Sequence, residues 1–554
     1  MKDLLRLGWP GDLLTNPVDA ATLHCDEPNT FAWSRANLAE AMPGVSTPLS
    51  WEFTAPSTVS VARSMFAMLG VVSAHELTAP LATAAEAATT LFFGRAALNV
   101  DVMRRYIARV PGADPDEFER QVLGRSRGAS PEPKERWRLP IVAARLPYNV
   151  ARFRSQTERN RVEVEAWWKT EVARLPSASL VSAIEAFDDA VRKHVDLVAV
   201  HSFGIIIGQA YYSSLAKLCA SRGLEGLELD LSGSGEGTVE TAIVDDIARV
   251  AAGELDLQGF LSAHGFRGPD EGELASASWR EAPDPILRLV ELYRRGEVQR
   301  TAAAVDRHAI ARARLLRALP AWRRPLARRL VETVNRYMKL REVGKSTFVR
   351  SRDVARAAAR RVGALLVEDG AVSDADDVFF LTRAELDGAA GPALRALVAE
   401  RRALRAHYEL LDIPDHFVGV PEPRVRERFT LAAAGDIISG VPASGGTFEG
   451  IARVLRSPDD FDALSDDEVL VCELTDPAWA PLLQLAGAVV IDVGGALSHG
   501  AIVARELGIP AVIGTVDGTD RIPPGARLRV DGTAGTVELL RIPEQEEPCL
   551  ALQA

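Results

Sequence analysis

The spacing of apolar residues changes once along the chain, near residue 440. Upstream, apolar residues recur every three to four positions in long runs, which is the period of a helix with one buried face. The most regular stretch, 301–368, is rich in Ala, Arg and Leu and has few helix-breaking residues. Downstream, short apolar runs alternate with turn residues, as strands do in a small α/β domain. The sequence therefore predicts a large, mostly α-helical domain followed by a small α/β domain.

We place the boundary after residue 435, with a helical domain at 1–435, an α/β domain at 436–543 and a tail at 544–554. The Pro-rich segment IPDHFVGVPEPRVRERF upstream of this boundary is typical of a linker. Helices are expected near 477–486 and 499–507. The predicted strands are FEGIARVL, EVLVCEL, AGAVVIDVGG, AVIG, ARLRVDG and TVELL.

Two local patterns in the first domain also carry predictions. The polar stretch SRANLAEA is expected to form a helix that stops at Pro43 and Gly44. The short apolar run DVFFLT, 377–382, could form a single strand.

Composition excludes several classes of protein. Lys and Arg number 64 against 76 Asp and Glu, and a net charge of −12 argues against a general binder of nucleic acid. The four cysteines are far apart and form no CxxC pair, which argues against a disulfide framework or a zinc site. The first residues lack the apolar core of a signal peptide. We expect a cytoplasmic protein without a bound metal.

One uncharged run, Leu197–Ala216, is about as long as a membrane-spanning helix requires. It contains His201, Gln209, several serines and two glycines, so a helix buried in a large helical core explains it better. We therefore expect no membrane partner. His201 itself is either a core histidine or part of a substrate pocket.

The segment IDVGGALSHGAIVARELGIPAVIG, residues 491–514, combines several features of a ligand site. An apolar strand ends at Gly494 and Gly495, where the missing side chains allow a tight turn and close approach of a ligand to the main chain. Ser498 stands at the N-cap position of a helix that begins at about His499. The Gly-Ile-Pro sequence that follows the helix ends it.

His499 is thus expected in the first turn of a helix, where unpaired N–H groups and partial positive charge favour a bound phosphate. A neutral imidazole is a competent nucleophile, so His499 could carry a phosphoryl group on a ring nitrogen. Thr475 and Asp476 lie at another junction between a strand and a helix and could add a hydroxyl and a carboxylate. The alternative is a histidine on an ordinary surface turn, but the glycines, the cap and the flanking strands together favour the phosphate site.

This segment closely resembles the phosphohistidine signature of the phosphoenolpyruvate (PEP)-utilising enzymes, which include pyruvate phosphate dikinase and rifampicin phosphotransferase. The resemblance implies that His499 is phosphorylated and that its domain swivels between two active sites. Gly494, Gly495 and Ser498 would support the phosphate, and Arg505 either orients the helix or only satisfies its end. The rest of the swivelling domain is matched by SGVPASGGTFEGIARVL (439–455), LTDPAWAPLLQLAGAVV (474–490) and VDGTAGTVELL (530–540).

Weaker similarities extend upstream to the helical substrate domain of rifampicin phosphotransferase. On this resemblance Arg341 and Lys345, which share one helix face, hold a transferring phosphoryl group. The alternative is a solvated charged face on which Glu342 and Arg350 form ordinary ion pairs. The similar segments are WSRANLAEAMPGVSTPL (33–49), HGFRGPDEGELASASWREAPDP (264–285), RYMKLREVGKSTFVR (336–350) and DVFFLTRAEL (377–386).

Full-length members of the family begin with an ATP-grasp domain that phosphorylates the histidine. The substrate-domain resemblance here starts by about residue 31, which leaves no room for such a domain. We therefore expect a separate ATP-grasp partner that binds ATP and Mg²⁺, and no tightly bound cofactor on this chain.

A cluster of ionisable residues surrounds two glycines in the segment 264–285. His264, Arg267, Glu271 and Glu273 could form a substrate wall or an acid–base site. The alternative is a structural loop in which Arg267 pairs with a glutamate. The candidate residues of the substrate pocket are His201, His264, Arg267, Glu273, Glu342 and Arg350.

The sequence thus predicts a phosphotransferase component that relays a phosphoryl group from an ATP-grasp partner through His499 to the hydroxyl of a small molecule. Two alternatives remain open at this point. The helical pocket could catalyse another reaction, such as an elimination or rearrangement, with the α/β domain as a fixed lid. The chain could also be a non-catalytic binding subunit.

Overall fold

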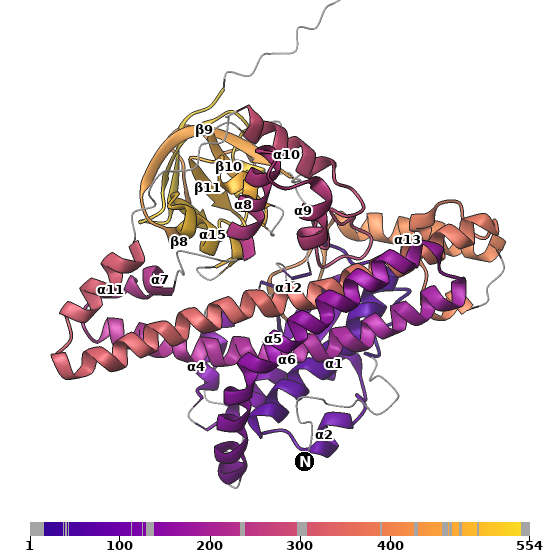
Figure 1. Ribbon diagram of the computed structural model, residues 1–554, viewed down its shortest axis with the longest axis horizontal. Helices are drawn as coiled ribbons and strands as arrows, with labels where there is room; N and C mark the ends of the chain where they lie inside the picture. Colours follow the sequence, from indigo (N-terminus) through magenta and orange to yellow (C-terminus); the bar gives the residue numbers. More distant parts are fainter. Residues whose placement is uncertain are drawn as a thin grey trace, which may run out of the picture. The chain divides into compact units, whose positions relative to one another are not determined.

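The chain forms two compact units. The first comprises Met1–Ala242, Asp256–Pro283 and His308–Arg426, and the second comprises Ile243–Leu255, Asp284–Arg307 and Glu427–Ala554. A large helical region is followed by a mixed α/β region, as predicted (Figure 1). The computed structural model describes residues 16–543 except 37, 39–40, 43, 112, 124–125, 129–137, 233–238, 296–306, 388–390, 426–429, 457–463, 465–467, 476–478 and 496–497.

Four long helices build the body of the first unit (Figure 1). The helix α6 packs along α12 and α1, and α5 packs along α12. Their shared core includes Phe53, Trp168, Phe187 and Val354. These helices are α1 (Pro48–Leu69), α5 (Leu139–Arg174), α6 (Leu180–Ala220) and α12 (Arg324–Glu368).

Shorter helices surround this body. They are α2 (Ala74–Thr78), α3 (Val100–Ala108), α4 (Pro115–Leu123), α7 (Leu227–Ser232), α9 (Leu257–His264), α11 (Arg307–Arg317), α13 (Gly391–Glu409) and the 3₁₀ turns η1 (Ala84–Glu86), η3 (Leu175–Ser177), η4 (Ala321–Arg323), η5 (Ala375–Phe380) and η6 (Ala384–Asp387). The helix α10 (Asp284–Arg294) and most of α8 (Val239–Ala251) belong to the second unit. Within that unit, the Tyr293 hydroxyl of α10 donates a hydrogen bond of 2.6 Å to Gln484.

The helix α6 is, among the described residues, long and apolar enough by length and composition alone to cross a membrane. In its most apolar window, 44% of the residues are buried inside the protein. Ala183, Phe187 and Val191 of this helix belong to the core of the first unit. A core helix of this kind passes the same length and composition test.

The first unit also contains a small antiparallel sheet, which the sequence did not predict. Its strands are β1 (Ala32–Ser34), β2 (Thr89–Phe92), β3 (Arg95–Asn99) and β5 (His416–Val418), in the order β2-β3-β1-β5, and β4 (Leu411–Asp412) pairs separately with β6 (Arg424–Val425). The helix expected in SRANLAEA falls partly on residues 37, 39 and 40, which lie outside the described residues; Ser34 ends β1, and Leu38 and Ala41 lie in turns. Trp33 pairs with Asn99 on one side and with Phe417 on the other, and this pairing determines the local structure.

The strand that the sequence suggested for DVFFLT is wrong, because the structure has the 3₁₀ turn η5 at these residues. Asp374 and Asp377 form a capping box at its start, which favours a helical turn. Val378, Phe379 and Phe380 are all buried, so the run is apolar on every side and its pattern does not distinguish a strand from a buried turn.

The second unit is built on an eight-stranded sheet in the order β7-β14-β13-β9-β10-β11-β12-β8. Its four central strands, β9 to β12, are mutually parallel. All six predicted strands are present, and the predicted helix at 499–507 is α15 (His499–Leu507). The strands are β7 (Ile437–Ser439), β8 (Val441–Ser444), β9 (Thr447–Leu455), β10 (Glu468–Cys472), β11 (Ala488–Ile491), β12 (Ala511–Ile513), β13 (Arg527–Asp531) and β14 (Thr536–Arg541), and the short helices are α14 (Ala480–Leu483) and α16 (Gly518–Arg521).

Candidate functional site

The parallel strands β10, β11 and β12 end at the same edge of the sheet, where ligands of α/β folds usually bind. The turn after β11 is fixed there by Asp492, which is buried. Its carboxylate accepts hydrogen bonds from the Thr515 hydroxyl at 2.6 Å, the Thr519 N–H at 3.0 Å and the Thr519 hydroxyl. These hydrogen bonds therefore fix the backbone at the start of the segment that leads into α15.

His499 is the first residue of α15. The Ser498 side chain accepts a hydrogen bond from the Ala501 N–H, as expected of the N-cap. Gly508 ends the helix in the left-handed conformation, with φ of 74°. A phosphate bound at this helix N-terminus would accept hydrogen bonds from the first N–H groups of α15, which have no partner within the helix.

The glycines of this motif differ in whether a side chain could be accommodated at their position. Gly494 has a φ of 140°, a conformation that side chains rarely allow, whereas a Cβ at Gly495 would meet nothing within 4 Å. A Cβ at Gly500 would lie 2.6 Å from the Thr475 hydroxyl and 2.4 Å from Ile491. Thr475 is buried directly against the first turn of α15 at Gly500, whereas Asp476 and the side chain of His499 lie outside what the structure describes.

Arg505 connects α15 to the edge of the sheet. Its guanidinium donates a hydrogen bond of 2.8 Å to the Ala443 carbonyl in β8. This contact holds the last turn of the helix and gives Arg505 a structural role in the second unit. Of the residues predicted near the phosphate, Thr475, Gly495 and Ser498 lie at the start of α15, where the Ser498 N–H donates a hydrogen bond of 2.9 Å to the Gly495 carbonyl. Gly494 lies in the segment after β11, and Arg505 lies at the end of α15.

The cations predicted for the helical domain lie on α12 in the first unit. Arg341 Nε is 3.7 Å from Glu342. Lys345 Nζ is 3.9 Å from Glu271, and Arg267 binds the same Glu271 carboxylate at 2.9 Å. The segment 264–285 and α12 therefore share one carboxylate between two cations. Arg341 and Lys345 are both partly exposed, so a phosphoryl group could still reach them.

Glu273, predicted as a pocket residue, lies at the N-terminus of α1. Its carboxylate accepts hydrogen bonds from the Thr47 N–H at 3.1 Å, the Thr47 hydroxyl at 2.7 Å and the Ser50 hydroxyl. The Ala275 N–H adds a further bond of 2.9 Å. An anion with this many donors at a helix N-terminus is well stabilised, so the contacts of Glu273 serve to attach the loop to α1.

His264 and Arg350 are both buried beside aromatic rings of the same loop region. His264 ends α9, with its ring 5.0 Å from that of Phe260. The Arg350 guanidinium lies 4.0 Å from the Phe266 ring, and Arg267 lies 5.2 Å from the same ring. Burial lowers the pKa of Arg350 to about 10, although Glu165 acts in the opposite direction. Two guanidinium groups around one ring concentrate positive charge in this part of the helical unit.

His201 lies on α6 against Gly344 of α12, where a Cβ would stand 2.8 Å from its Nδ1. Nδ1 has no hydrogen-bond partner among the described residues, and a cavity of about 10 Å³, room for about one water, adjoins the ring. Burial lowers the pKa of His201 to about 3, and the cations Arg341 and Lys345 lower it too. His201 is therefore neutral at physiological pH and supports the turn that carries both cations.

The neutral state of His201 predicts a dependence of stability on pH. The unfolded histidine takes up a proton near pH 6.5, whereas the folded one does so only near pH 3. The free energy of unfolding should therefore fall as pH drops from 6.5 toward 3, by at most about 1.4 kcal/mol per pH unit. His194, also buried, contributes in the same direction because burial holds its pKa well below the ordinary value. Urea unfolding of the native chain and of His201→Gln at pH 7 and pH 5 measures this, and equal losses in the two proteins would contradict it.

Sequence reasoning missed a row of arginines on α12. Arg352 donates to the Glu271 carbonyl at 3.2 Å, and Arg356 donates to the carbonyls of Glu273 and Leu274 at 3.2 Å each. Arg360 donates to the Ala275 carbonyl at 3.0 Å. Their four-residue spacing in RSRDVARAAAR was the available signal, since such residues share one face of a helix.

Asp353 was missed as well. It is completely buried and accepts hydrogen bonds from Trp168 Nε1 at 2.7 Å, from Arg280 Nε and Nη2 at 3.1 Å each, and from Arg356 at 3.4 Å. Burial alone would raise its pKa, but Arg280 and the other donors lower the pKa below its ordinary value. This ion cluster joins α5, α12 and the segment 264–285.

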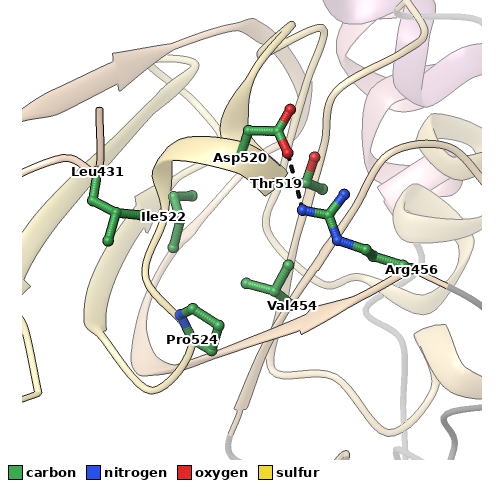
Figure 2. Close-up of a pocket in the computed structure, with 7 residues that line it drawn as sticks. All are labelled: Leu431, Val454, Arg456, Thr519, Asp520, Ile522 and Pro524. Atoms are coloured by element: carbon green, nitrogen blue, oxygen red, sulfur yellow. Dashed lines mark hydrogen bonds and ion pairs between the residues drawn. The ribbon is translucent and has the colours of Figure 1, made fainter. Parts of the chain in front are cut away.

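The hollow shown in Figure 2 is a separate feature of the second unit. It has a volume of about 350 Å³ and is lined by Leu431, Val454, Arg456, Thr519, Asp520, Ile522 and Pro524. The Arg456 guanidinium points to Asp520, 2.9 Å away, so both charges are already paired (Figure 2). None of the site residues predicted from the sequence lines this hollow.

Comparison with known proteins connects both units to one family. Residues 464–535 match the mobile domain of the PEP-utilising enzymes, and residues 228–342 match the rifampicin phosphotransferase fourth domain. Both matched regions thus resemble parts of the rifampicin phosphotransferases and their PEP-utilising relatives. The mobile-domain match contains β10 to β12, α15 and His499. The fourth-domain match contains the segment 264–285 and ends at Glu342, after Arg341 and before Lys345.

Individual relatives support this assignment. An uncharacterized protein of Mycobacterium tuberculosis is 35% identical over 297 residues, which are 52% of this chain and 32% of that protein. A rifampicin phosphotransferase of a Streptomyces species is 31% identical over 330 residues, 55% of this chain and 37% of the enzyme. The uncharacterized phosphotransferase YvkC of Bacillus subtilis is 35% identical over 191 residues, 32% of this chain and 23% of that protein. The chain thus matches only 23–37% of the length of these relatives.

Proposed function

We propose that this relative of rifampicin phosphotransferase relays a phosphoryl group through His499 to the hydroxyl of a small molecule. The observation that carries the proposal is the position of His499. It is the first residue of a capped helix, directly after a glycine turn at the carboxyl edge of parallel strands. That position combines a nucleophile with the N–H groups and the helix dipole that stabilise its phosphorylated form.

The first step takes the phosphoryl group from ATP. A ring nitrogen of His499 attacks the γ-phosphorus of ATP, so that an N–P bond forms, the bond from phosphorus to the bridging oxygen breaks and ADP leaves with the bonding electrons. Attack at the β-phosphorus instead releases AMP and leaves a pyrophosphoryl group, from which water then removes the terminal phosphate as inorganic phosphate. We propose that a separate ATP-grasp protein binds the ATP and its Mg²⁺ for this step. The phosphorylated His499 would be held by this chain itself, because the first turn of α15 offers hydrogen-bond donors to the new phosphate oxygens.

The second step transfers the group to the acceptor. The acceptor oxygen attacks phosphorus, an O–P bond forms, and the N–P bond breaks to return the neutral imidazole. Arg341 and Lys345 would neutralise the charge of the phosphoryl group during transfer, as clamping cations do in other phosphotransferases. His264 is the base we propose for the hydroxyl proton, since it lies in the segment 264–285 that also carries the carboxylate bound to Lys345.

The test is direct labelling of the native chain. Purified protein is incubated with ATP labelled in either the β- or the γ-phosphate, alone and with an ATP-grasp protein encoded near its gene. Both labels are needed because a dikinase transfers the β-phosphoryl group. The expected result is acid-labile label that maps to His499 by peptide mass spectrometry and appears only with the ATP-grasp protein. Absence of label under every condition would contradict the relay and favour a different reaction in the helical unit.

A further inference from the structure

The first unit carries an arginine-rich surface that the proposed reaction does not use. From 307 to 331 the chain has eight arginines and no Asp or Glu, although the protein as a whole has a net charge of −12. The segment comprises α11, the turn η4 and the first turns of α12. We call its exposed side the arginine tip, made of Arg312, Arg314, Arg317, Arg323, Arg328 and Arg329 together with Ile310, Trp322 and Leu326.

The arginine tip lies at one end of the long helices (Figure 1). Leu315, Leu319 and Val331 of the segment are buried against Leu215 and Cys219 at the C-terminal end of α6, and against α7. The apolar face of α11 is therefore already used for packing. A second set of side chains projects outward, and this set is unusual because it combines arginines with large apolar residues.

Three large apolar side chains project from this tip. Trp322 and Leu326 are each 72% exposed and Ile310 is 56% exposed. The guanidinium of Arg323 lies 4.6 Å from the Trp322 ring. Single exposed apolar residues are common on protein surfaces, but here three of them stand among cations. The arginine tip therefore presents apolar and cationic side chains together, so its surface is amphipathic.

The arginines of the tip have no acidic partners of their own. None of the six exposed arginines forms an ion pair within the part of the chain that the structure describes. Among the described residues, the neighbouring elements carry the carboxylates Glu225, Glu228 and Asp230 by α7 and Glu332 on α12. The local charge is thus strongly positive, and screening over about 8 Å keeps it distinct from the acidic remainder of the protein.

We infer that the arginine tip binds the surface of an anionic lipid membrane. Clusters of four to eight basic residues beside exposed Trp and Leu are what anionic headgroups and the interface below them attract. Exposed Leu and Ile favour lipid over RNA, because aliphatic side chains cannot stack on bases. They project separately from the end of a helix pair, which suits a deformable surface better than the packed apolar core of a protein interface. This peripheral contact departs from the sequence-based expectation of no membrane partner, which rested on the lack of a spanning segment.

The experiment uses the full chain and two kinds of vesicle, phosphatidylcholine alone and phosphatidylcholine mixed with phosphatidylglycerol. Co-sedimentation at low salt should show binding to the mixed vesicles only, and added salt should release the protein. The variant Arg323→Gln/Arg328→Gln/Arg329→Gln should bind at least about tenfold more weakly, because each basic residue near such a surface contributes substantially. Trp322→Ala should also weaken binding.

A matched control separates the tip from net charge. Arg154→Gln/Arg159→Gln/Arg192→Gln changes the charge by the same amount at exposed positions on α5 and α6 and should bind as the native chain does. Equal weakening by both triple variants, or no binding of the native chain to mixed vesicles, would overturn the inference. Binding to a labelled RNA without binding to vesicles would identify nucleic acid as the ligand and would overturn it too.

Discussion

Replacing His499 with alanine should abolish acid-labile phosphorylation of the chain. The ring nitrogen is the atom that forms the N–P bond in the proposed relay, and alanine offers no substitute nucleophile. The fold should persist, because the Ser498 side chain and the backbone conformation of Gly508, rather than residue 499, form the two ends of α15. The measurement is incorporation of label from ATP in the presence of the ATP-grasp protein, followed by treatment with acid.

Two controls make this result specific. His75→Ala removes an exposed histidine of the first unit and should leave labelling at the native level. The melting temperature of His499→Ala should match that of the native chain, which excludes unfolding as the cause of lost label. Label that survives in the folded His499→Ala protein would refute the assignment of His499 as the phosphate carrier.

The second large effect is on stability, at Asp353 in the first unit. Asp353→Ala leaves Arg280, Arg356 and the Trp168 N–H without their shared acceptor in a buried site. Removing one partner from a buried ion cluster typically costs about 3–5 kcal/mol, because the remaining charges stay buried without compensation. Urea unfolding followed by the helical signal in circular dichroism measures the change, against a total stability that is often only about 5–15 kcal/mol.

A surface ion pair on α5 serves as the comparison. Glu158 lies 2.5 Å from Arg161 one turn away, and the two side chains are 56% and 37% exposed. Glu158→Ala should therefore cost less than about 1 kcal/mol. If Asp353→Ala cost no more than Glu158→Ala, the cluster would not hold the loop and helices together as described.

The strands and the helix α15 of the second unit could be predicted from the sequence, because the residues that indicate them lie within or directly beside each element. Short apolar runs bounded by turn residues marked each of the six predicted strands, and the capping serine and terminal glycine marked both ends of α15. The sheet in the first unit gave no such signal. Its strands are three to five residues long, and Trp33 pairs with Phe417, which lies almost four hundred positions away. Short strands that depend on distant partners are invisible to a pattern read in a window of neighbouring residues.

The same distinction applies to the candidate site. The position of His499 followed from the residues beside it, and the four-residue spacing placed Arg341 and Lys345 on one face of a helix. The attachment of Glu273 to Thr47 joins residues 226 positions apart, so only the folded chain reveals it. The shared use of Glu271 by Lys345 and Arg267 likewise depends on how the segment 264–285 packs on α12.

The arginines of α12 hold the segment 271–275 by its main-chain carbonyls, and this arrangement allows the side chains of the segment to be replaced. Every residue type has the same carbonyl, so mutation of a side chain in the segment leaves those hydrogen bonds available. Arg356 reaches two carbonyls at once through different nitrogens, which a lysine could not reproduce. The side chains on the surface of the segment could therefore vary while the helix that supports it stays constant.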